Sequence, residues 1–542
     1  DYDELLLLNH TFYGPIFPFD ELFYVMGSRE CDFWGITEHS EVKPNPFTGQ
    51  GVLPRHLNSH FIAIRKPMLT SAAFRQYWEN MDSIGSYIDS IIKHESKFTK
   101  HFKNLGYMPG VYISNDDYSS PYPLLYEIDS VLENRCPIIK RRSFFHPTVD
   151  LESVAVDLPR AISFMRKLSS YPEELIWRNI VRSAQLRTLN ENAGLMTILP
   201  EVALDDVDPN GYGRIAVCGH IYYDDMLNEI LEYANNIPVA FDFLATTDTV
   251  EKKKVIEQRL KGEPKISHVD VRVVEQNRGR DMSALFITFR DEFIADTYDL
   301  VCRVHTKKTP QVHAQRGAHF KRHMLDNLLY SPGYVTNVLN LFKSRPWVGL
   351  AIPPLVNISY FTFGQSWYNN KERTQALADD LELSVSLDDH TPVAPNGTMY
   401  WFRPVALRKM FAHKWKWSDY SAEPNHHDGS LAHAQERLIA YVVQDAGYTT
   451  EHIASPQSAA RNYTMIEFKL SAVLSRLPLQ SMPWLMAHLD KWKASGYPLW
   501  VSQEEASSGR VATYASQPTI RQAFREVPAA IARSLRFRLR KR

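Results

Sequence analysis

The chain has 542 residues, too many for one ordinary hydrophobic core, so two or three domains are predicted. Hydrophobic residues make up 44% and charged residues 23%, as is usual for globular proteins. A formal net charge of −1 provides no field that attracts nucleic acid, and no nucleic-acid partner is expected. The four cysteines form no Cys-x-x-Cys pair, which argues against a zinc ribbon or a disulfide scaffold.

The first predicted element is a buried strand over Leu5–Leu8. Because a natural chain rarely begins inside a buried strand, we expect the sequence to be part of a longer protein. It contains no signal peptide and no apolar run long enough to span a bilayer. A cytoplasmic protein is therefore expected.

Four landmarks occur twice, in the same order. The pairs are Tyr2–Thr11 with Tyr298–Lys307, Cys31–Ile36 with Arg345–Leu350, Ser59–Pro67 with Gly397–Pro404, and Glu95–Tyr107 with Glu436–Tyr448. Each has an ordinary explanation, because many strands end in polar residues and glycine commonly ends a helix. The shared order instead predicts two related units, here called the first repeat (residues 1–150) and the second repeat (residues 213–455).

Between the repeats, residues 157–190 have the apolar spacing of helices, and residues 200–213 have the composition of a linker. We expect residues 151–212 to form a helical connector. Residues 456–542 are expected to form a C-terminal helical extension with a basic tail.

The second repeat begins with alternating strands and helices. Strands are predicted over 214–218, 241–246 and 269–274, and helices over 224–235 and 250–260. This alternation predicts an α/β fold, a parallel sheet with helices on both faces. Ligands bind at the carboxyl ends of such strands. The corresponding opening elements are missing from the first repeat.

Residues 277–281, Asn-Arg-Gly-Arg-Asp, follow the third of these strands. Arg278 and Arg280 could bind a diphosphate, because guanidinium pairs with phosphate oxygens through two hydrogen bonds. Asn277 and Asp281 could contact the nucleotide or the sugar. A capped loop with solvated arginines is the alternative.

His305, Lys307 and Lys308 follow the next strand. Many nucleotide-sugar transferases of this architecture have an Asp-x-Asp motif here that holds a divalent metal. This segment has no carboxylate, and its lysines could neutralise a leaving diphosphate directly. Whether Mg²⁺ or Mn²⁺ is needed stays open, as does the alternative of a lysine-rich surface turn.

A helix is predicted over Ala432–Ala446, with Asp428 as its N-cap. His433 and Glu436 share one face of it. Glu436 or Asp428 could act as general base on a sugar hydroxyl. A pairing of Glu436 with an arginine is the structural alternative, and a metal cluster that adds His426 and His427 fits no known zinc spacing.

The end of the chain, Arg521–Arg542, is rich in arginine interleaved with apolar residues. This pattern is typical of a basic amphipathic helix on an anionic membrane surface. A solvated basic tail is equally compatible with the composition.

Several strings resemble the rhamnan synthesis protein F family, which takes part in making rhamnose-containing surface polysaccharides and O-antigens. They are Leu6–Asn9 with Tyr13–Pro15, Cys31–Thr37, Asn277–Asp281, Val304–Lys308 and Asp428–Leu438. The family typically has Asn-Asp where this chain has Asn9-His10, which argues against catalysis by the first repeat.

The resemblance implies two nucleotide-sugar-transferase units of the GT-A type, the first lacking its front half. It implies a glycosyltransferase, with dTDP-L-rhamnose as the donor and a lipid-linked glycan at the inner membrane face as the acceptor. One alternative is a non-catalytic scaffold or glycan-binding protein, which the missing Asp-x-Asp favours. A sugar-phosphate transferase is a weaker alternative.

Overall fold

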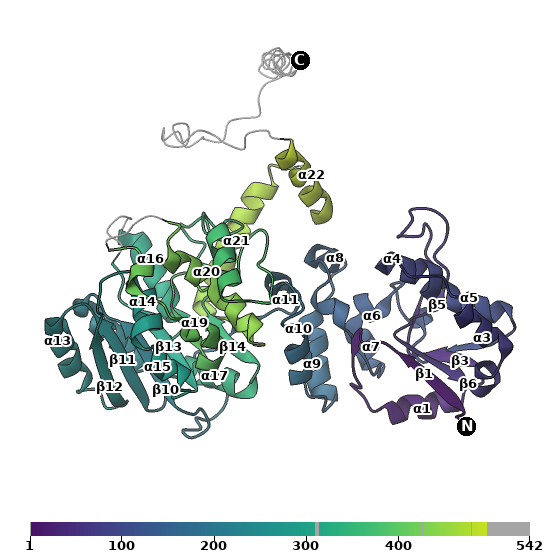
Figure 1. Cartoon of the computed structure of the whole chain (residues 1–542), viewed down its shortest axis with the longest axis horizontal. Helices are drawn as coiled ribbons and strands as arrows, with labels where there is room; N and C mark the ends of the chain where they lie inside the picture. Colours follow the sequence, from purple (N-terminus) through teal and green to yellow (C-terminus); the bar gives the residue numbers. More distant parts are fainter. Residues whose placement is uncertain (1, 309–313, 424–427, 478–479, 496–542) are drawn as a thin grey trace, which may run out of the picture. The chain divides into compact units, whose positions relative to one another are not determined.

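The computed structural model describes residues 2–308, 314–423, 428–477 and 480–495 (Figure 1). The chain divides into two compact parts, residues 1–477 and 478–542. Among the described helices, none has both the length and the apolar character needed to cross a membrane. The finer division into four regions stays a prediction, and the basic tail Arg521–Arg542 lies outside the described residues.

An eight-stranded mixed sheet forms the centre of the second repeat, in the order β12-β11-β10-β13-β15-β14-β16-β9. Its strands are β9 (Met196–Ile198), β10 (Ile215–His220), β11 (Phe241–Thr247), β12 (Ile266–Val273), β13 (Leu300–His305), β14 (Val348–Ile352), β15 (Tyr400–Phe402) and β16 (Thr449–Ala454). Only β15 runs antiparallel to its neighbours. The three predicted front strands are confirmed. The connector, predicted to be helical, also supplies the edge strand β9.

Helices cover both faces of this sheet, as the alternation predicted (Figure 1). One layer contains α12 (Leu227–Ala234), α13 (Val250–Leu260), α16 (Ala314–Asp326) and α17 (Pro332–Ser344). The other contains α14 (Arg280–Ser283), α15 (Arg290–Ile294), α18 (Lys371–Asp380), α19 (Arg408–Ala412) and α20 (Leu431–Asp445).

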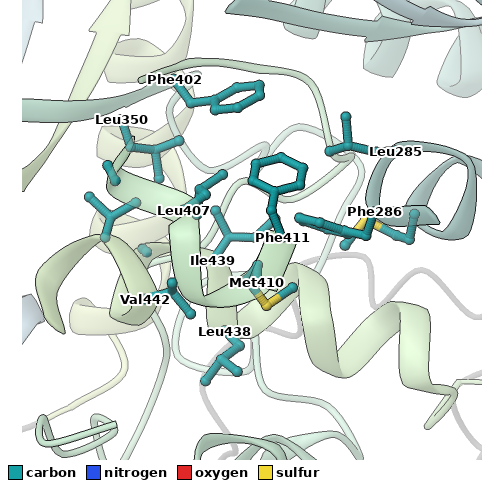
Figure 2. Close-up of a cluster of buried hydrophobic side chains, with 14 of the residues drawn as sticks. Leu285, Phe286, Leu350, Phe402, Leu407, Met410, Phe411, Leu438, Ile439 and Val442 are labelled. Carbon is teal, nitrogen blue, oxygen red and sulfur yellow. The ribbon is translucent and has the colours of Figure 1, made fainter. Parts of the chain in front are cut away.

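Successive strand residues enter opposite cores, because side chains alternate along a strand. Val217 packs in the α17 layer, whereas Ala216 and Cys218 pack in the α20 layer. Figure 2 shows part of the α20 core, where Phe402 of β15 and Leu350 of β14 meet Phe411, Leu438 and Val442.

The first repeat contains a four-stranded sheet in the order β1-β6-β3-β7. Its strands are β1 (Glu4–Leu8), β3 (Phe33–Gly35), β6 (Phe61–Arg65) and β7 (Pro109–Val111), covered by α1 (Phe19–Gly27), α3 (Ala72–Glu79) and α5 (Ser96–Asn104). The strands match β13-β15-β14-β16 in order and direction. The register also matches, because Leu5 pairs with Ile64 as Val301 pairs with Phe402. The predicted repeat is thus confirmed for these four strands.

Two details of that prediction were wrong. The second landmark matched Phe33 with Trp347. In the sheets Phe33 pairs with Ile64 and Leu350 pairs with Phe402, so Phe33 corresponds to Leu350, three residues further on. β1 is also not a buried strand, because Leu8 is 55% exposed and Leu5 and Leu6 are each 37% exposed. Among the described residues β1 pairs only with β6, whereas its counterpart β13 is covered on both edges.

The connector helices α9 (Leu158–Leu168), α10 (Glu174–Ile180) and α11 (Leu186–Asn192) confirm the helical prediction for residues 157–190. They are tied to the second repeat by hydrogen bonds from Gln444 to the carbonyl oxygens of Val181 and Ala184, at 2.7 and 2.8 Å. The chain continues from β16 into α21 (Pro456–Leu474), and α22 (Met482–Ala494) belongs to the other compact part.

Candidate functional site

The candidate site lies at the carboxyl ends of β10, β11 and β13. Strand order reverses at β10, which has β11 on one side and β13 on the other, and ligands of open α/β sheets bind at such a switch point. His220 and His305 end β10 and β13 side by side. A narrow hollow between these strand ends is lined by His220, Thr246, Asp281 and Arg303.

A buried ion pair forms the floor of this site. Arg303, in the middle of β13, has a 2% exposed side chain, and its Nη2 lies 2.6 Å from Oδ2 of Asp281. Its Nη1 donates to the hydroxyl of Tyr400 at 2.8 Å. Burial alone would raise the pKa of Asp281, but His305, Arg303 and a hydrogen bond from Thr398 together lower it. Asp281 is therefore a buried carboxylate anion.

The loop before β15 closes over this pair. Thr398 donates its hydroxyl to Asp281 Oδ2 at 2.6 Å, and His305 Nε2 lies 2.8 Å from the carbonyl oxygen of Gly397. Burial lowers the pKa of His305, against the opposing charge of Asp281. Nε2 carries a proton that it donates to this carbonyl, because a carbonyl oxygen can only accept a hydrogen bond. Gly397 has a φ of 96°, a backbone conformation that favours glycine.

Segment 277–281 turns sharply into α14. Gly279 has a φ of 69°, and a Cβ there would lie 2.3 Å from the ring of Tyr420, so no other residue fits. Arg278 Nε donates to the carbonyl oxygens of Trp417 and Tyr420 at 2.9 and 2.8 Å. Arg278 thus holds the 417–420 loop in place. The α14 N-cap is Gly279.

Lys307 lies near this floor, where the charges of Glu436 and Asp281 act on its ammonium group. Its Nζ lies 4.7 Å from the centre of the Phe320 ring. Burial lowers the pKa of Lys307, against the opposing charges of Glu436 and Asp281. An ammonium group in this position can bind an anionic ligand.

Glu436 faces the same loop from α20. Its Oε1 accepts the Gly397 N–H at 2.8 Å, and its Oε2 lies 2.7 Å from Nη1 of Arg437. Both oxygens are therefore engaged, as the arginine-pairing alternative anticipated. Glu436 connects α20 to the loop that carries Thr398.

His433 lies one turn before Glu436, with its Nδ1 2.8 Å from the hydroxyl of Ser430. Burial lowers the pKa of His433, so its neutral form prevails at pH 7. The helix begins at Leu431 with Ser430 as N-cap, so the prediction of Asp428 as the cap was wrong. Asp428 instead accepts hydrogen bonds from Asn370 Nδ2 at 2.8 Å and from the Asn369 N–H at 3.2 Å.

The other predicted residues lie around this centre. Arg280 pairs with Glu423 at 3.6 Å, and the carbonyl oxygen of Asn277 accepts the Glu423 N–H at 3.3 Å. Lys308 Nζ lies 2.5 Å from Asp225 Oδ2, so this lysine is paired on the protein surface. The structure thus brings Asp281, His305, Lys307, His433 and Glu436 together. Asp428 lies beside His433, with its Oδ1 3.9 Å from the His433 Nδ1, whereas Asn277 and Lys308 lie at the edge.

The described residues contain no group of three histidine, cysteine or acidic side chains able to hold a metal ion. His426 and His427 lie outside them.

Sequence reasoning missed Arg303, Thr398, Tyr400 and His220. Arg303 could have been identified from the sequence, because a charged residue inside an apolar strand must find a buried partner. Thr398 and Tyr400 could not, since their partners lie more than ninety positions away along the chain.

The chain was compared with known proteins. A family model described as rhamnan synthesis protein F matches residues 1–448. Two proteins described as uncharacterized protein WxcX, from Xanthomonas campestris pv. campestris strains B100 and ATCC 33913, are each 30% identical over 260 residues. The alignment covers 47% of this chain and 34% of each relative, so the chain spans about a third of the length of these relatives.

Proposed function

Because the chain belongs to the rhamnan synthesis protein F family, which supports a role in polysaccharide synthesis, we propose that its second repeat is a glycosyltransferase. It would transfer a sugar, rhamnose by analogy with the family description, from a nucleotide-activated donor to a growing cell-surface glycan. The carrying observation is that Asp281 and Glu436 both bind the loop before β15 at the switch point of the sheet, with Lys307 after β13 and His433 one turn before Glu436. The sheet order, with one antiparallel strand among parallel ones, is compatible with a GT-A-type unit.

The donor would lie across the ends of β10 and β13. Lys307 and Arg280 would bind its diphosphate, because both are cations beside the buried Asp281 carboxylate. The negative charge that develops on the leaving diphosphate would be stabilised by the Lys307 ammonium. Asp281 would orient this end of the site through Thr398 and His305 rather than contact the leaving group.

His433 is the best general base among the three predicted catalytic residues. With Nδ1 hydrogen bonded to Ser430, its Nε2 can accept the proton of an acceptor hydroxyl. The hydroxyl oxygen then attacks the anomeric carbon, and the bond from that carbon to the diphosphate breaks. Glu436 acts as a positioning residue, because both of its oxygens are hydrogen bonded or paired.

A divalent cation does not fit the described donor atoms. Mg²⁺ and Mn²⁺ require several oxygen ligands. The described carboxylates here are each engaged by the protein, Asp281 by Arg303, Glu436 by Arg437, Glu423 by Arg280 and Asp428 by Asn370.

The acceptor is proposed to be a lipid-linked glycan at the cytoplasmic face of the membrane, reached with the help of the basic residues of Arg521–Arg542. A non-catalytic scaffold is the second candidate. It is favoured by the pairing of Glu436 and by the use of Arg278 to hold the 417–420 loop.

Calorimetric titration with nucleotide sugars, dTDP-L-rhamnose first, separates these candidates. We expect binding that weakens strongly in Lys307→Ala, and transfer to a lipid-linked acceptor that is lost in His433→Ala while donor binding persists. Lys308→Ala is the matched control, because Lys308 pairs with Asp225 instead. Absence of binding by any nucleotide sugar, with or without metal, would support the scaffold.

A further inference from the structure

An aromatic loop borders the candidate site. Between β14 and α18, Phe361 is 85% exposed, and Phe363 and Tyr368 are each 49% exposed. A single exposed aromatic ring needs no explanation. Three of them in one short loop beside a polar site indicate a binding surface.

This loop is fixed at its base, so its exposed rings do not result from poor packing. Trp367 is buried and stacks on Tyr441 of α20, with ring centres 6.2 Å apart. The carbonyl oxygen of Ser366 accepts a hydrogen bond from Arg437 Nε at 3.1 Å. Asn370, directly after the loop, donates to Asp428 at 2.8 Å. The loop is thus anchored to α20 and to the residues just before it.

Two chains of contacts connect the exposed rings to the site. The Tyr368 ring lies 5.9 Å from the Arg437 guanidinium, which itself pairs with Glu436, and the Tyr368 hydroxyl donates to the carbonyl oxygen of Phe361 at 3.3 Å. On the other side Tyr360 packs on Phe320, with ring centres 5.3 Å apart, and Phe320 in turn packs against Lys307.

We propose that Phe361, Phe363 and Tyr368 form a carbohydrate subsite that holds the acceptor glycan next to His433. This inference rests on the proposed function and adds the place where the acceptor binds. A pyranose ring presents C–H groups that carry a small positive charge, and these pack against the negative face of an aromatic ring. Rhamnose has a methyl group in place of one hydroxymethyl group, so it offers further apolar surface.

The surroundings favour a sugar over a lipid chain. Asp428 and the Tyr368 hydroxyl border the rings, and their oxygen atoms can accept further hydrogen bonds from sugar hydroxyls. An acyl chain offers these groups no hydrogen bond. The matching segment of the first repeat, residues 36–60, offers only Phe47, at 36% exposure, as an exposed aromatic ring.

The test measures binding of rhamnose oligosaccharides to the full chain by calorimetry and saturation-transfer NMR, with and without dTDP. The variant Phe361→Ala with Phe363→Ala is expected to weaken binding about tenfold, the order expected for losing aromatic contacts. Tyr368→Phe keeps the ring and should have a smaller effect than Tyr368→Ala. Tyr24→Ala, which removes an equally exposed ring (84%) from α1, is the matched control and should bind like the wild type.

The proposal is overturned if the wild type binds none of these oligosaccharides, or if the double variant binds them as the control does. It is also overturned if the double variant loses binding to phosphatidylglycerol vesicles but keeps oligosaccharide binding, since the rings would then contact lipid.

Donor titration, run in parallel, tests the proposed function separately. If oligosaccharide binding depends on the rings but no donor binds, the subsite proposal stands and the transferase proposal is wrong. If the double variant binds donor and transfers sugar with unchanged acceptor affinity, the transferase proposal stands and the subsite proposal is wrong.

Discussion

The two repeats share a four-stranded sheet and differ in the polar residues around it. In both, a glutamate accepts a backbone N–H just before the central antiparallel strand. Glu95 accepts that of Ser59 at 3.0 Å, and Glu436 accepts that of Gly397 at 2.8 Å. The glutamate contact is present in both repeats although the polar residues around it differ. We therefore assign this glutamate a structural role, which is to position the loop before the strand in both repeats.

Both repeats also have an arginine at the end of this antiparallel strand, which is β6 in the first repeat and β15 in the second. Arg65 donates to the carbonyl oxygens of Met26 and Cys31, and Arg403 to those of Phe342 and Val348. Each arginine thereby donates a hydrogen bond to a carbonyl oxygen near the end of the preceding helix, Met26 of α1 or Phe342 of α17.

The polar residues differ at several positions, including the following three. Leu7 of the first repeat corresponds to Arg303 of the second, and Thr11 corresponds to Lys307. Ile92, three residues before Glu95, corresponds to His433, three residues before Glu436. In the first repeat an amine comes from elsewhere, because Lys140 Nζ donates to Thr11 Oγ1 at 2.8 Å. Burial lowers the pKa of Lys140 to about 8, against the charge of Glu95. The ion pair and the imidazole are thus special to the second repeat.

The largest effect is expected from Arg303→Leu, which introduces the residue of the first repeat. Asp281 would remain buried without its partner, which costs about 3–5 kcal/mol of unfolding free energy. Urea denaturation measures this loss. Adding Asp281→Asn removes the uncompensated charge and should restore part of the stability. Wild-type stability in the single variant would mean that Asp281 finds another partner.

Next in size is Lys307→Ala. If Lys307 stabilises the leaving diphosphate, kcat/KM should fall about 10²–10³-fold, as for removal of one electrostatic contact to the transition state. Lys140→Ala is the control in the first repeat, and transfer should stay unchanged. Equal losses in both variants would contradict the assignment of catalysis to the second repeat.

Glu436→Ala should cost about 1–3 kcal/mol, because the Gly397 N–H loses its acceptor. Glu95→Ala should cost less, because the Ser59 N–H is exposed to water. Glu436→Gln retains an acceptor oxygen and should keep most of its stability and transfer activity. Loss of transfer in this stable variant would identify Glu436 as the base instead of His433.

The smallest effect is a shift along the pH axis. Transfer requires the neutral His433 ring, so the rate should fall as the pH drops through its pKa. Burial and the nearby Arg437 lower this pKa, against Glu436 and Asp428, so the acid limb of kcat should lie below pH 6.5. The pH profile of kcat measures it. An acid limb above pH 6.5 would exclude His433 in this environment.

Much of the fold followed from periodicity and spacing. The charged helix over Val250–Leu260 has the predicted bounds, because its apolar residues recur at helical spacing and Thr249 caps it. The first two front strands followed from their largely apolar sequences, and the third from valines that alternate with Asp270 and Arg272. The α20 cap was misplaced because Asp428 and Ser430 are both suitable N-cap residues, and Asn369 and Asn370 bind the Asp428 carboxylate.

The sequence by itself determined the family, the order of strands and helices in the second repeat, and the side of its sheet where polar residues gather, because all of these depend on local patterns. Tertiary structure decided the roles of the residues within the site. Glu436 became a loop anchor, Arg278 a brace for residues 417–420, and Arg303 the partner of Asp281, through contacts with residues distant in the chain. A buried charge or donor takes its role from the group that satisfies it, and that group is known only once the chain has folded.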